Sequence, residues 1–327
     1  MSILVTGSAG HLGEALMRTL RAGGLPARGV DLLPSPFTTD VGSISDEGFL
    51  SEVMAGVTAV IHAATLHKPH VATHSERSFI DVNVTGTLAL LQAARDAGVK
   101  AFVYTSTTSA FGSALTPGPG APAAWITEAV SPVPRNIYGV TKVAAESLCE
   151  LFHRRDSLPV VILRTSRFFP EADDDAATRQ AYETANAQAN ELLYRRVDIE
   201  DVVGAHLLAV AYAGDVGFDR FIISATTPFE WTELAELRAD AAAVVVRIYP
   251  QCAELYAAKG WKLLPSIDRV YVNERARAEL GWRPKYDFQH VLDCLAAGRD
   301  FRSELAVEIG SKGYHAETFE GGPYPVS

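Results

Sequence analysis

Three glycines spaced three residues apart lie near the start of the chain, between a short apolar run and a helical pattern. Residues 3–5 are aliphatic, which predicts a buried strand, and residues 11–21 repeat apolar side chains at helical spacing. The glycines that join them are Gly7, Gly10 and Gly13. Glycines in such a loop permit a tight turn and a close approach of the backbone to a phosphate, and the N-terminus of the following helix attracts an anion. The order of strand, glycine loop and helix therefore predicts a dinucleotide-binding sheet.

A carboxylate follows at the end of the next predicted strand, residues 28–31. Asp31 lies 18 residues beyond Gly13, and from there a carboxylate can accept hydrogen bonds from both hydroxyls of an adenosine ribose. The same charge would repel a 2′-phosphate, so NAD is favoured over NADP as the cofactor. The alternative is that Asp31 caps a loop.

Strand and helix patterns alternate along the first half of the chain, and the alternation ends near residue 164. Further strands are predicted for residues 59–64, 101–106, 160–163 and 221–224, and helices for residues 78–97, 138–153 and 197–213. This order predicts an α/β fold in which helices cover both faces of a parallel sheet. We expect residues 1–165, joined by residues 197–225, to form the nucleotide-binding domain. Residues 166–196 and 226–327 are expected to form a smaller, mixed substrate lobe and a C-terminal tail.

The charge and the cysteines of the chain limit its partners and its location. The 327 residues include 29 Lys and Arg against 39 Asp and Glu, a net charge of −10, which disfavours nucleic acids and anionic membranes as partners. No apolar stretch reaches the roughly 18 residues needed to cross a bilayer. The widely separated Cys149, Cys252 and Cys294 form no CxxC pair and predict buried thiols in a reducing compartment. We therefore expect a cytoplasmic protein.

A tyrosine and a lysine stand four residues apart at the start of the helix predicted for residues 138–153. Tyr138 and Lys142 therefore project from one face of that helix. The strand before it ends in hydroxyl side chains at residues 105–108, at the carboxyl edge of the predicted sheet. A phenol can transfer a proton, a nearby cation lowers the pKa of that phenol, and a hydroxyl can hold the substrate oxygen. The three residue types together predict proton transfer to or from an oxygen that is bound to a substrate carbon. A Tyr-x-x-x-Lys spacing alone usually marks a solvated helix face.

With these motifs in this order, the chain resembles the extended short-chain dehydrogenase/reductase superfamily, and within it the NAD-dependent epimerase/dehydratase group. The resemblance covers about residues 3–213 and includes the further segments Gly42-Ser43-Ile44-Ser45-Asp46, Val60-Ile61-His62-Ala63-Ala64, Asn83-Val84-Thr85-Gly86-Thr87 and Leu163-Arg164. It implies a Rossmann-type doubly wound parallel sheet and NAD as the cofactor. It further implies that Tyr138 is the catalytic acid and base, that Lys142 binds the nicotinamide ribose and tunes Tyr138, and that Thr107 holds the substrate oxygen.

The same resemblance implies which residues bind the cofactor. The glycine loop would contribute Gly7, Gly10, His11, Leu12 and Gly13. Asp31 would hold the adenosine ribose, and the adenine would be flanked by Ser43, where the family has an Asp, and Ile44. The cofactor channel would be lined by Ala63, Ala64 and Thr105, with Asn83 in the wall that supports it.

Two departures from the family concern the substrate. The 4,6-dehydratases of the superfamily have Asp-Glu after the catalytic Ser or Thr, whereas Thr108 and Ser109 follow Thr107 here, so a dehydratase is not expected. Sugar-nucleotide epimerases have an Asn near the position of Arg167 and an Arg-Asp segment further on, both serving the substrate diphosphate. Here Arg167 and Arg195 are predicted to clamp a carboxylate or phosphate of the substrate, and Thr108 to contact it. The alternative for each arginine is a salt bridge on the surface or between the lobes.

Four of the nine histidines lie in a short span, at His62, His67, His70 and His74. Their spacing, on a predicted strand end and the loop after it, does not favour a zinc site, so no metal is expected. By the resemblance this loop borders the nicotinamide, which makes His67 or His70 a candidate substrate contact. The alternative is that both are ordinary polar loop residues.

These observations favour an NAD-dependent enzyme that transfers hydride at a carbinol carbon of a sugar-like substrate: a sugar, a sugar acid or a sugar nucleotide. They do not separate an epimerase, which must retain its reduced cofactor, from a dehydrogenase, which must release it. A catalytically silent NAD-binding regulatory or scaffold protein is the alternative from another class, and Asp31 and the arginines disfavour a steroid- or flavonoid-type reductase. The helices predicted for residues 78–97 and 138–153 are expected to form a four-helix bundle between two copies, which would give a homodimer.

Overall fold

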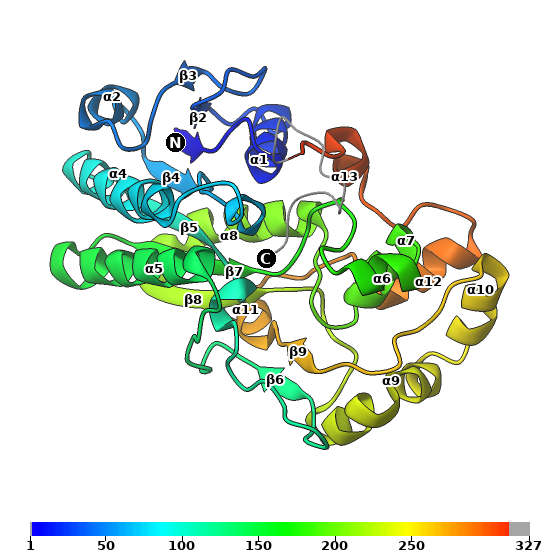
Figure 1. The fold of residues 1–327 in the computed structure, drawn as a ribbon. Helices are drawn as coiled ribbons and strands as arrows, with labels where there is room; N and C mark the ends of the chain where they lie inside the picture. Colours follow the sequence, from blue (N-terminus) through cyan, green and yellow to red (C-terminus); the bar gives the residue numbers. More distant parts are fainter. Residues whose placement is uncertain (1, 314–327) are drawn as a thin grey trace.

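A seven-stranded parallel sheet forms the centre of the structure, a computed structural model that describes residues 2–313 (Figure 1). The strand order is β3-β2-β1-β4-β5-β7-β8. The strands are β1 Ile3–Thr6, β2 Ala27–Asp31, β3 Asp40–Val41, β4 Ala59–His62, β5 Ala101–Thr107, β7 Val160–Thr165 and β8 Phe218–Ile223. All neighbouring strands in it run parallel, so the predicted α/β fold with a parallel sheet is confirmed.

The strand order reverses next to β1. The chain places β2 and β3 on one side of β1 and then crosses over to place β4, β5, β7 and β8 on the other side. Ile3 therefore pairs with Ala27 in β2 and with Ala59 in β4. In sheets of this kind ligands bind at the carboxyl ends of the strands, beside the point where the order reverses.

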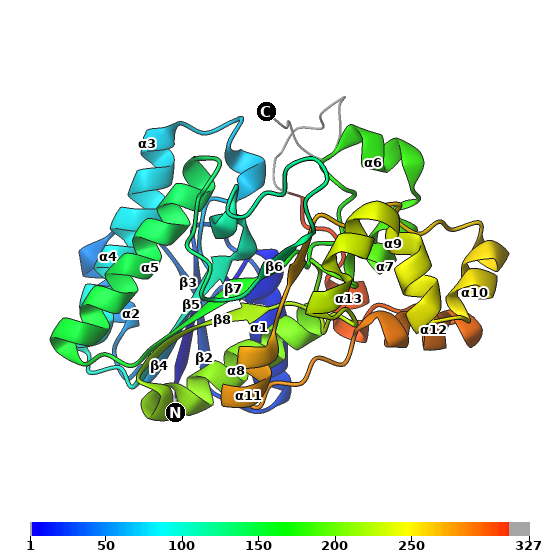
Figure 2. The same ribbon diagram turned by 90° about the horizontal axis from the view of Figure 1, so that it is seen from below.

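Helices cover both faces of the sheet, as Figure 2 shows. One face is covered by α1 (His11–Ala22) and α8 (Ile199–Val216), and the other by α2 (Glu47–Val53), α4 (Gly86–Asp96) and α5 (Ile137–Asp156). Alternate residues of each strand point to opposite faces. Ile3 and Val5 accordingly belong to the apolar cluster beneath α1 and α8, whereas Leu4 belongs to the cluster beneath α4 and α5.

The segment before α4 differs from its prediction. The sequence predicts one α-helix over residues 78–97, but the structure has a short α3 (Glu76–Phe79), a π-helical segment (Ile80–Thr85) and then α4. The apolar spacing on which the prediction depends does not distinguish this π-helical segment of six residues from the α-helical turns beside it. Such insertions are frequent at functional sites, and this one contains Asn83, which is buried.

A smaller group of elements lies beyond the carboxyl edge of the sheet. It contains a two-stranded parallel sheet of β6 (Ala124–Ile126) and β9 (Arg269–Tyr271), and the helices α6 (Ala176–Ala181), α7 (Thr184–Glu191), α9 (Leu234–Ile248), α10 (Cys252–Lys259) and α12 (Phe288–Ala296). β6, β9, α9, α10 and α12 share a separate apolar cluster that includes Leu193, Leu237, Val244 and Phe288. Helix α7 instead contributes Ala189 to a neighbouring cluster. The lobe forms one wall of the site described below.

The last described elements return to the large sheet. Helix α11 (Glu274–Glu279) packs against β8, and α13 (Glu304–Ile309) packs against α1 and α8. Residues 310–313 therefore end close to the glycine loop, whereas the predicted tail beyond residue 313 lies outside the described residues. Within residues 2–313, no helix combines the length and the apolar character needed to span a membrane.

Candidate functional site

A pocket of about 730 Å³ lies at the carboxyl edge of the sheet, beside the reversal of the strand order. Its lining comes from the glycine loop, from the residues that follow β2, β4, β5 and β7, and from the C-terminal segment. Most of the predicted site residues meet here: Gly7, Gly10, His11, Leu12, Asp31, Ser43, Ile44, Ala63, Ala64, His67, Thr105, Thr107, Thr108, Tyr138, Lys142, Arg167 and Arg195. Gly13 and Asn83 are the exceptions among the predicted residues.

Backbone contacts explain why the first and third glycines are required. Gly7 has a φ of +76°, and a Cβ there would lie 2.8 Å from the backbone nitrogen of Ala64. A Cβ on Gly13 would lie 1.9 Å from the carbonyl oxygen of Gly7. Helix α1 begins at His11 without a hydrogen bond from a capping side chain, so its first amides suit an anionic ligand. The loop therefore fits the pyrophosphate of a dinucleotide.

Asp31 lies at the end of the pocket expected to hold the adenosine. Its Oδ2 accepts a hydrogen bond from the backbone N–H of Ala9 at 3.0 Å, and its Oδ1 accepts one from that of Leu33 at 3.0 Å. Each carboxylate oxygen has a second lone pair for a further hydrogen bond. Ser43 and Ile44 line the same region of the pocket. The acidic group thus also fixes the shape of the glycine loop, and it fits a ribose diol.

The phenol of Tyr138 and the hydroxyl of Thr107 come together at the opposite end of the pocket. Asn136 caps α5 by accepting a hydrogen bond from Gly139 N–H, which places Tyr138 in the first turn. Burial raises the pKa of Tyr138 to about 12, and a hydrogen bond with Thr107 acts in the opposite direction. The lowering that the sequence predicts from a neighbouring cation is therefore not found, and burial raises the pKa of Tyr138 instead. At neutral pH this phenol is protonated.

Lys142 lies one turn further along α5 and is 2% exposed. Its Nζ donates a hydrogen bond to the carbonyl oxygen of Thr105 at 2.6 Å and lies 4.4 Å from the ring centroid of Tyr104. Burial lowers the pKa of Lys142 to about 7, although the Glu146 carboxylate acts to raise it. The amine and ammonium forms of Lys142 therefore coexist near neutral pH. Because Lys142 also lines the pocket, it fits the predicted contact with a ribose.

Asn83 lies behind the pocket wall and not on it. Its Oδ1 accepts hydrogen bonds from Leu66 N–H at 2.8 Å and from the Thr65 hydroxyl at 2.9 Å. Its Nδ2 donates to the carbonyl oxygen of Leu66 and to the Thr141 hydroxyl, both at 3.0 Å. Asn83 therefore joins the loop after β4 to α5 and positions the wall, so we describe it as a positioning residue.

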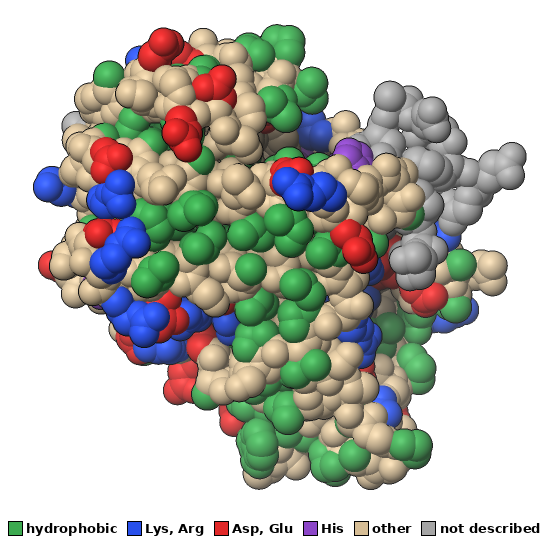
Figure 3. Space-filling model, turned by 60° about the vertical axis from the view of Figure 1, so that its left-hand side comes forward, with side chains coloured by type: hydrophobic (Ala, Val, Ile, Leu, Met, Phe, Trp, Pro, Cys, Tyr) green, Lys and Arg blue, Asp and Glu red, His purple; other side chains and the backbone are tan. Residues whose placement is uncertain are grey.

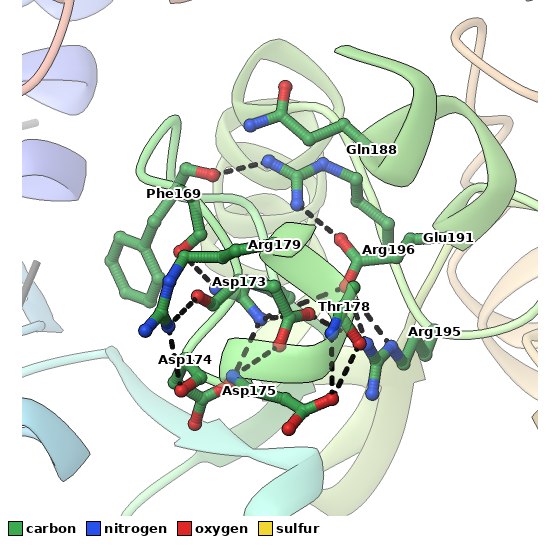
Figure 4. Close-up of polar contacts among 12 residues, drawn as sticks. Phe169, Asp173, Asp174, Asp175, Thr178, Arg179, Gln188, Glu191, Arg195 and Arg196 are labelled. Atoms are coloured by element: carbon green, nitrogen blue, oxygen red, sulfur yellow. Dashed lines mark hydrogen bonds and ion pairs between the residues drawn. The ribbon is translucent and has the colours of Figure 1, made fainter. Parts of the chain in front are cut away.

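The predicted substrate arginines, Arg167 and Arg195, are paired with carboxylates of the protein. Figure 4 shows Arg195 beside Asp173 and Glu191. Asp173 Oδ2 lies 3.0 Å from Arg167 Nη1 and 2.9 Å from Arg195 Nη2. Glu191 Oε1 lies 2.8 Å from Arg195 Nη2, and its Oε2 lies 2.6 Å from Arg196 Nη1. Although burial raises the pKa of Glu191, the surrounding arginines lower it to about 2. The salt bridges given as the alternative are present, and a clamp on the substrate stays a prediction.

His67 lines the pocket near Tyr138. Its ring centroid lies 6.3 Å from that of Tyr138 and 5.8 Å from that of Phe169. Burial lowers the pKa of His67 to about 3, so the imidazole is neutral. The adjacent Lys68 forms an ion pair with Asp174, which joins the loop after β4 to the loop after β7. Within residues 2–313, no group of three or more His, Cys, Asp or Glu is placed to hold a metal ion.

Several pocket residues have no counterpart in the sequence analysis. Tyr271, at the end of β9, and Lys312 and Gly313, beyond α13, line the same pocket as the glycine loop. Phe168 stacks on the ring of His11, with 6.0 Å between centroids and 9° between planes. These residues reach the pocket through packing between distant segments, so no local pattern signals them.

Comparisons with known proteins give this chain clear relatives. The model of the NAD dependent epimerase/dehydratase family matches residues 3–219. The GDP-6-deoxy-D-mannose reductase of Pseudomonas aeruginosa is 28% identical over 320 residues, which cover 94% of this chain and 99% of that protein. The UDP-glucose 4-epimerase of Rhizobium leguminosarum bv. trifolii is 28% identical over 327 residues, with 89% and 95% covered. A solved short-chain dehydrogenase/reductase superfamily protein from Agrobacterium tumefaciens with bound NAD has a TM-score of 0.66 and 25% identity, and the match covers 94% of this chain and 99% of that one.

Proposed function

The chain belongs to the NAD-dependent epimerase/dehydratase family, and on that basis we propose that it is an NAD-dependent epimerase or dehydrogenase acting at a carbinol carbon of a sugar-like substrate. Its cofactor is NAD, which the family uses and which is bound in the related Agrobacterium structure. One observation carries the proposal: Tyr138, Thr107 and Lys142 line one pocket with the glycine loop. A scaffold protein would have no need for this arrangement.

The chain's own residues would perform the proton transfer. Bound NAD supplies hydride acceptance and donation at the carbinol carbon. The Thr107 hydroxyl holds the substrate oxygen. Tyr138 removes the proton from the substrate hydroxyl in its phenolate form, which is the minor form at neutral pH because burial raises its pKa to about 12. In the reverse direction Tyr138 returns that proton to the carbonyl oxygen. The Lys142 ammonium, one turn along α5, favours the phenolate by its charge.

The names of the relatives support a sugar-like substrate, because they describe a reductase and an epimerase of sugar nucleotides. The arginine cluster affects how well a negatively charged substrate can bind. Arg167 and Arg195 already share the carboxylate of Asp173, so an anionic group of the substrate must compete with a carboxylate of the protein. Sugars, sugar acids and sugar nucleotides therefore all belong in the first screen.

The screen uses purified protein with NAD and a panel of these three substrate classes. We expect at least one compound either to produce net NADH, measured by its absorbance, or to be converted to an epimer, measured by NMR. Net NADH indicates a dehydrogenase, and epimer formation without net NADH indicates an epimerase. If NAD binds but no compound of the panel reacts, the silent NAD-binding protein becomes the better interpretation.

We also propose that the chain forms a homodimer through the outer faces of α4 and α5. Figure 3 shows a band of apolar side chains across this face. Ile80, in the π-helical segment before α4, is 39% exposed, and Val140 and Leu151 on α5 are 47% and 39% exposed. Exposed apolar bands of this kind often mark interaction sites. Helices that present such a band can pair with the same helices of a second copy, because an interface with twofold symmetry uses the same surface twice.

Leu151→Glu should convert the dimer to a monomer, since it places a charge in the proposed apolar contact. Light scattering after size exclusion would show a mass near twice 35.2 kDa for the wild type and near 35.2 kDa for the variant. Val307→Glu on α13, where Val307 is 51% exposed, is the matched control and should stay dimeric. A monomeric wild type would contradict the proposal.

A further inference from the structure

The segment after α13 reaches the phosphate-binding end of the cofactor pocket. Lys312 and Gly313 line the pocket together with Gly7 and Gly10. Helix α13 lies beside α1 in Figure 1 and packs against it. The Ser311 hydroxyl donates a hydrogen bond to Glu171 Oε1 at 2.7 Å, which fastens the segment to the loop after β7. The packing of α13 and the hydrogen bond of Ser311 thus hold Lys312 in position.

The first turn of α1 contains a buried carboxylate, and its negative charge opposes the binding of an anion at the N-terminus of this helix. The side chain of Glu14 is 6% exposed, and it lies one turn after Gly10, where the helix begins. A pyrophosphate at this end would be repelled by an uncompensated negative charge, and the low polarity of the site would strengthen the repulsion. Without a cation beside Glu14, we therefore expect the glycine loop to bind an anion less tightly.

Two cations compensate this carboxylate. Arg18 Nε lies 2.8 Å from Glu14 Oε1, within the same helix. Lys312 Nζ forms an ion pair with Glu14 Oε2 across 298 positions of the sequence. Only Lys312 of the two lines the pocket. Its charge is therefore available both to Glu14 and to an anion bound at the glycine loop.

We propose that Lys312 is a cofactor-binding residue, which neutralises Glu14 and presents positive charge to the pyrophosphate of NAD. The dinucleotide site is then complete only when the segment 310–313 is docked on α1. This assignment does not depend on the substrate or on the reaction, because it concerns the binding of the dinucleotide alone. It can be tested by binding, without turnover.

The test measures the dissociation constant of NADH by fluorescence titration of the full chain, freed of nucleotide that co-purifies with it. Lys312→Met should weaken binding about tenfold, the size expected for loss of one charge beside an anion in a partly buried site. Lys312→Arg should bind within about twofold of the wild type, since it keeps the charge. Lys285→Met is the matched control: Lys285 is an exposed lysine paired with Glu200 outside the pocket lining, and its loss should have no effect.

A second pair of variants tests the role of Glu14. In a Glu14→Gln background, Lys312→Met should weaken NADH binding less than about threefold, because the carboxylate that Lys312 neutralises is gone. Unchanged NADH affinity in the single Lys312→Met variant, with unchanged thermal unfolding, would overturn the proposal. An equally large loss in the Glu14→Gln background would overturn the part assigned to Glu14.

Discussion

Tyr138→Phe should reduce turnover by a factor of about 10² to 10⁴ while leaving the affinity for NADH nearly unchanged, because it removes the group that transfers the proton and nothing else. Phenylalanine fits the same buried position in the first turn of α5, where the tyrosine ring is 7% exposed. The measurement is kcat on the substrate found in the screen, together with NADH binding by fluorescence.

Tyr212→Phe provides the control for this change. Tyr212 lies in α8 and is 45% exposed, so loss of its hydroxyl should alter neither kcat nor NADH binding. If Tyr138→Phe kept nearly the full rate, the proton transfer would have to be assigned to another group. A loss of NADH affinity equal to the loss of rate would instead indicate that the phenol mainly binds the cofactor.

Glu146→Gln should lower the free energy of unfolding by about 3–5 kcal/mol, the cost of leaving a buried charge without its partner. Glu146 is 3% exposed, and its Oε2 lies 2.6 Å from Arg164 Nη2, which is itself 4% exposed. Its Oε1 also accepts hydrogen bonds from the Ser106 hydroxyl at 2.6 Å and from Arg164 Nε at 3.0 Å. The network joins α5 to β5 and β7. Urea unfolding would measure the change.

Glu150→Gln, one turn further along α5, is the comparison for this prediction. Glu150 is 34% exposed and pairs with Arg220 and Arg154 near the surface. Exposed pairs contribute about 0–1 kcal/mol, so this variant should unfold nearly like the wild type. Equal effects of the two substitutions would show that burial does not govern the strength of the Glu146 pair.

The sequence predicts the sheet and the cofactor loop well because both depend on neighbouring residues. A parallel strand buried on both faces is a short continuous apolar run, and β1, β4, β5 and β7 all have this character. The spacing of the glycines predicts that the backbone at Gly13 lies close to that at Gly7, and the structure has this close approach. All the residues expected around the dinucleotide except Gly13 and Asn83 therefore line one pocket.

Features made by distant segments are not predictable in this way. Strands β6 and β9 have three residues each and pair across about 145 positions, so neither has a recognisable pattern. The pairing of Arg167 with Asp173 depends on a loop whose course only the fold reveals. Burial, which determines the raised pKa of Tyr138, is likewise a property of the whole structure.

The two backbone hydrogen bonds to Asp31 have a consequence for engineering the coenzyme preference. A substitution meant to admit the extra phosphate of NADP would remove the anchor of Ala9 and Leu33 together with the repulsive charge. A substitution of Asp31 therefore changes the coenzyme selectivity and the order of the glycine loop together. A redesign that aims at NADP must supply new acceptors for those two amides before any cation added nearby can be useful.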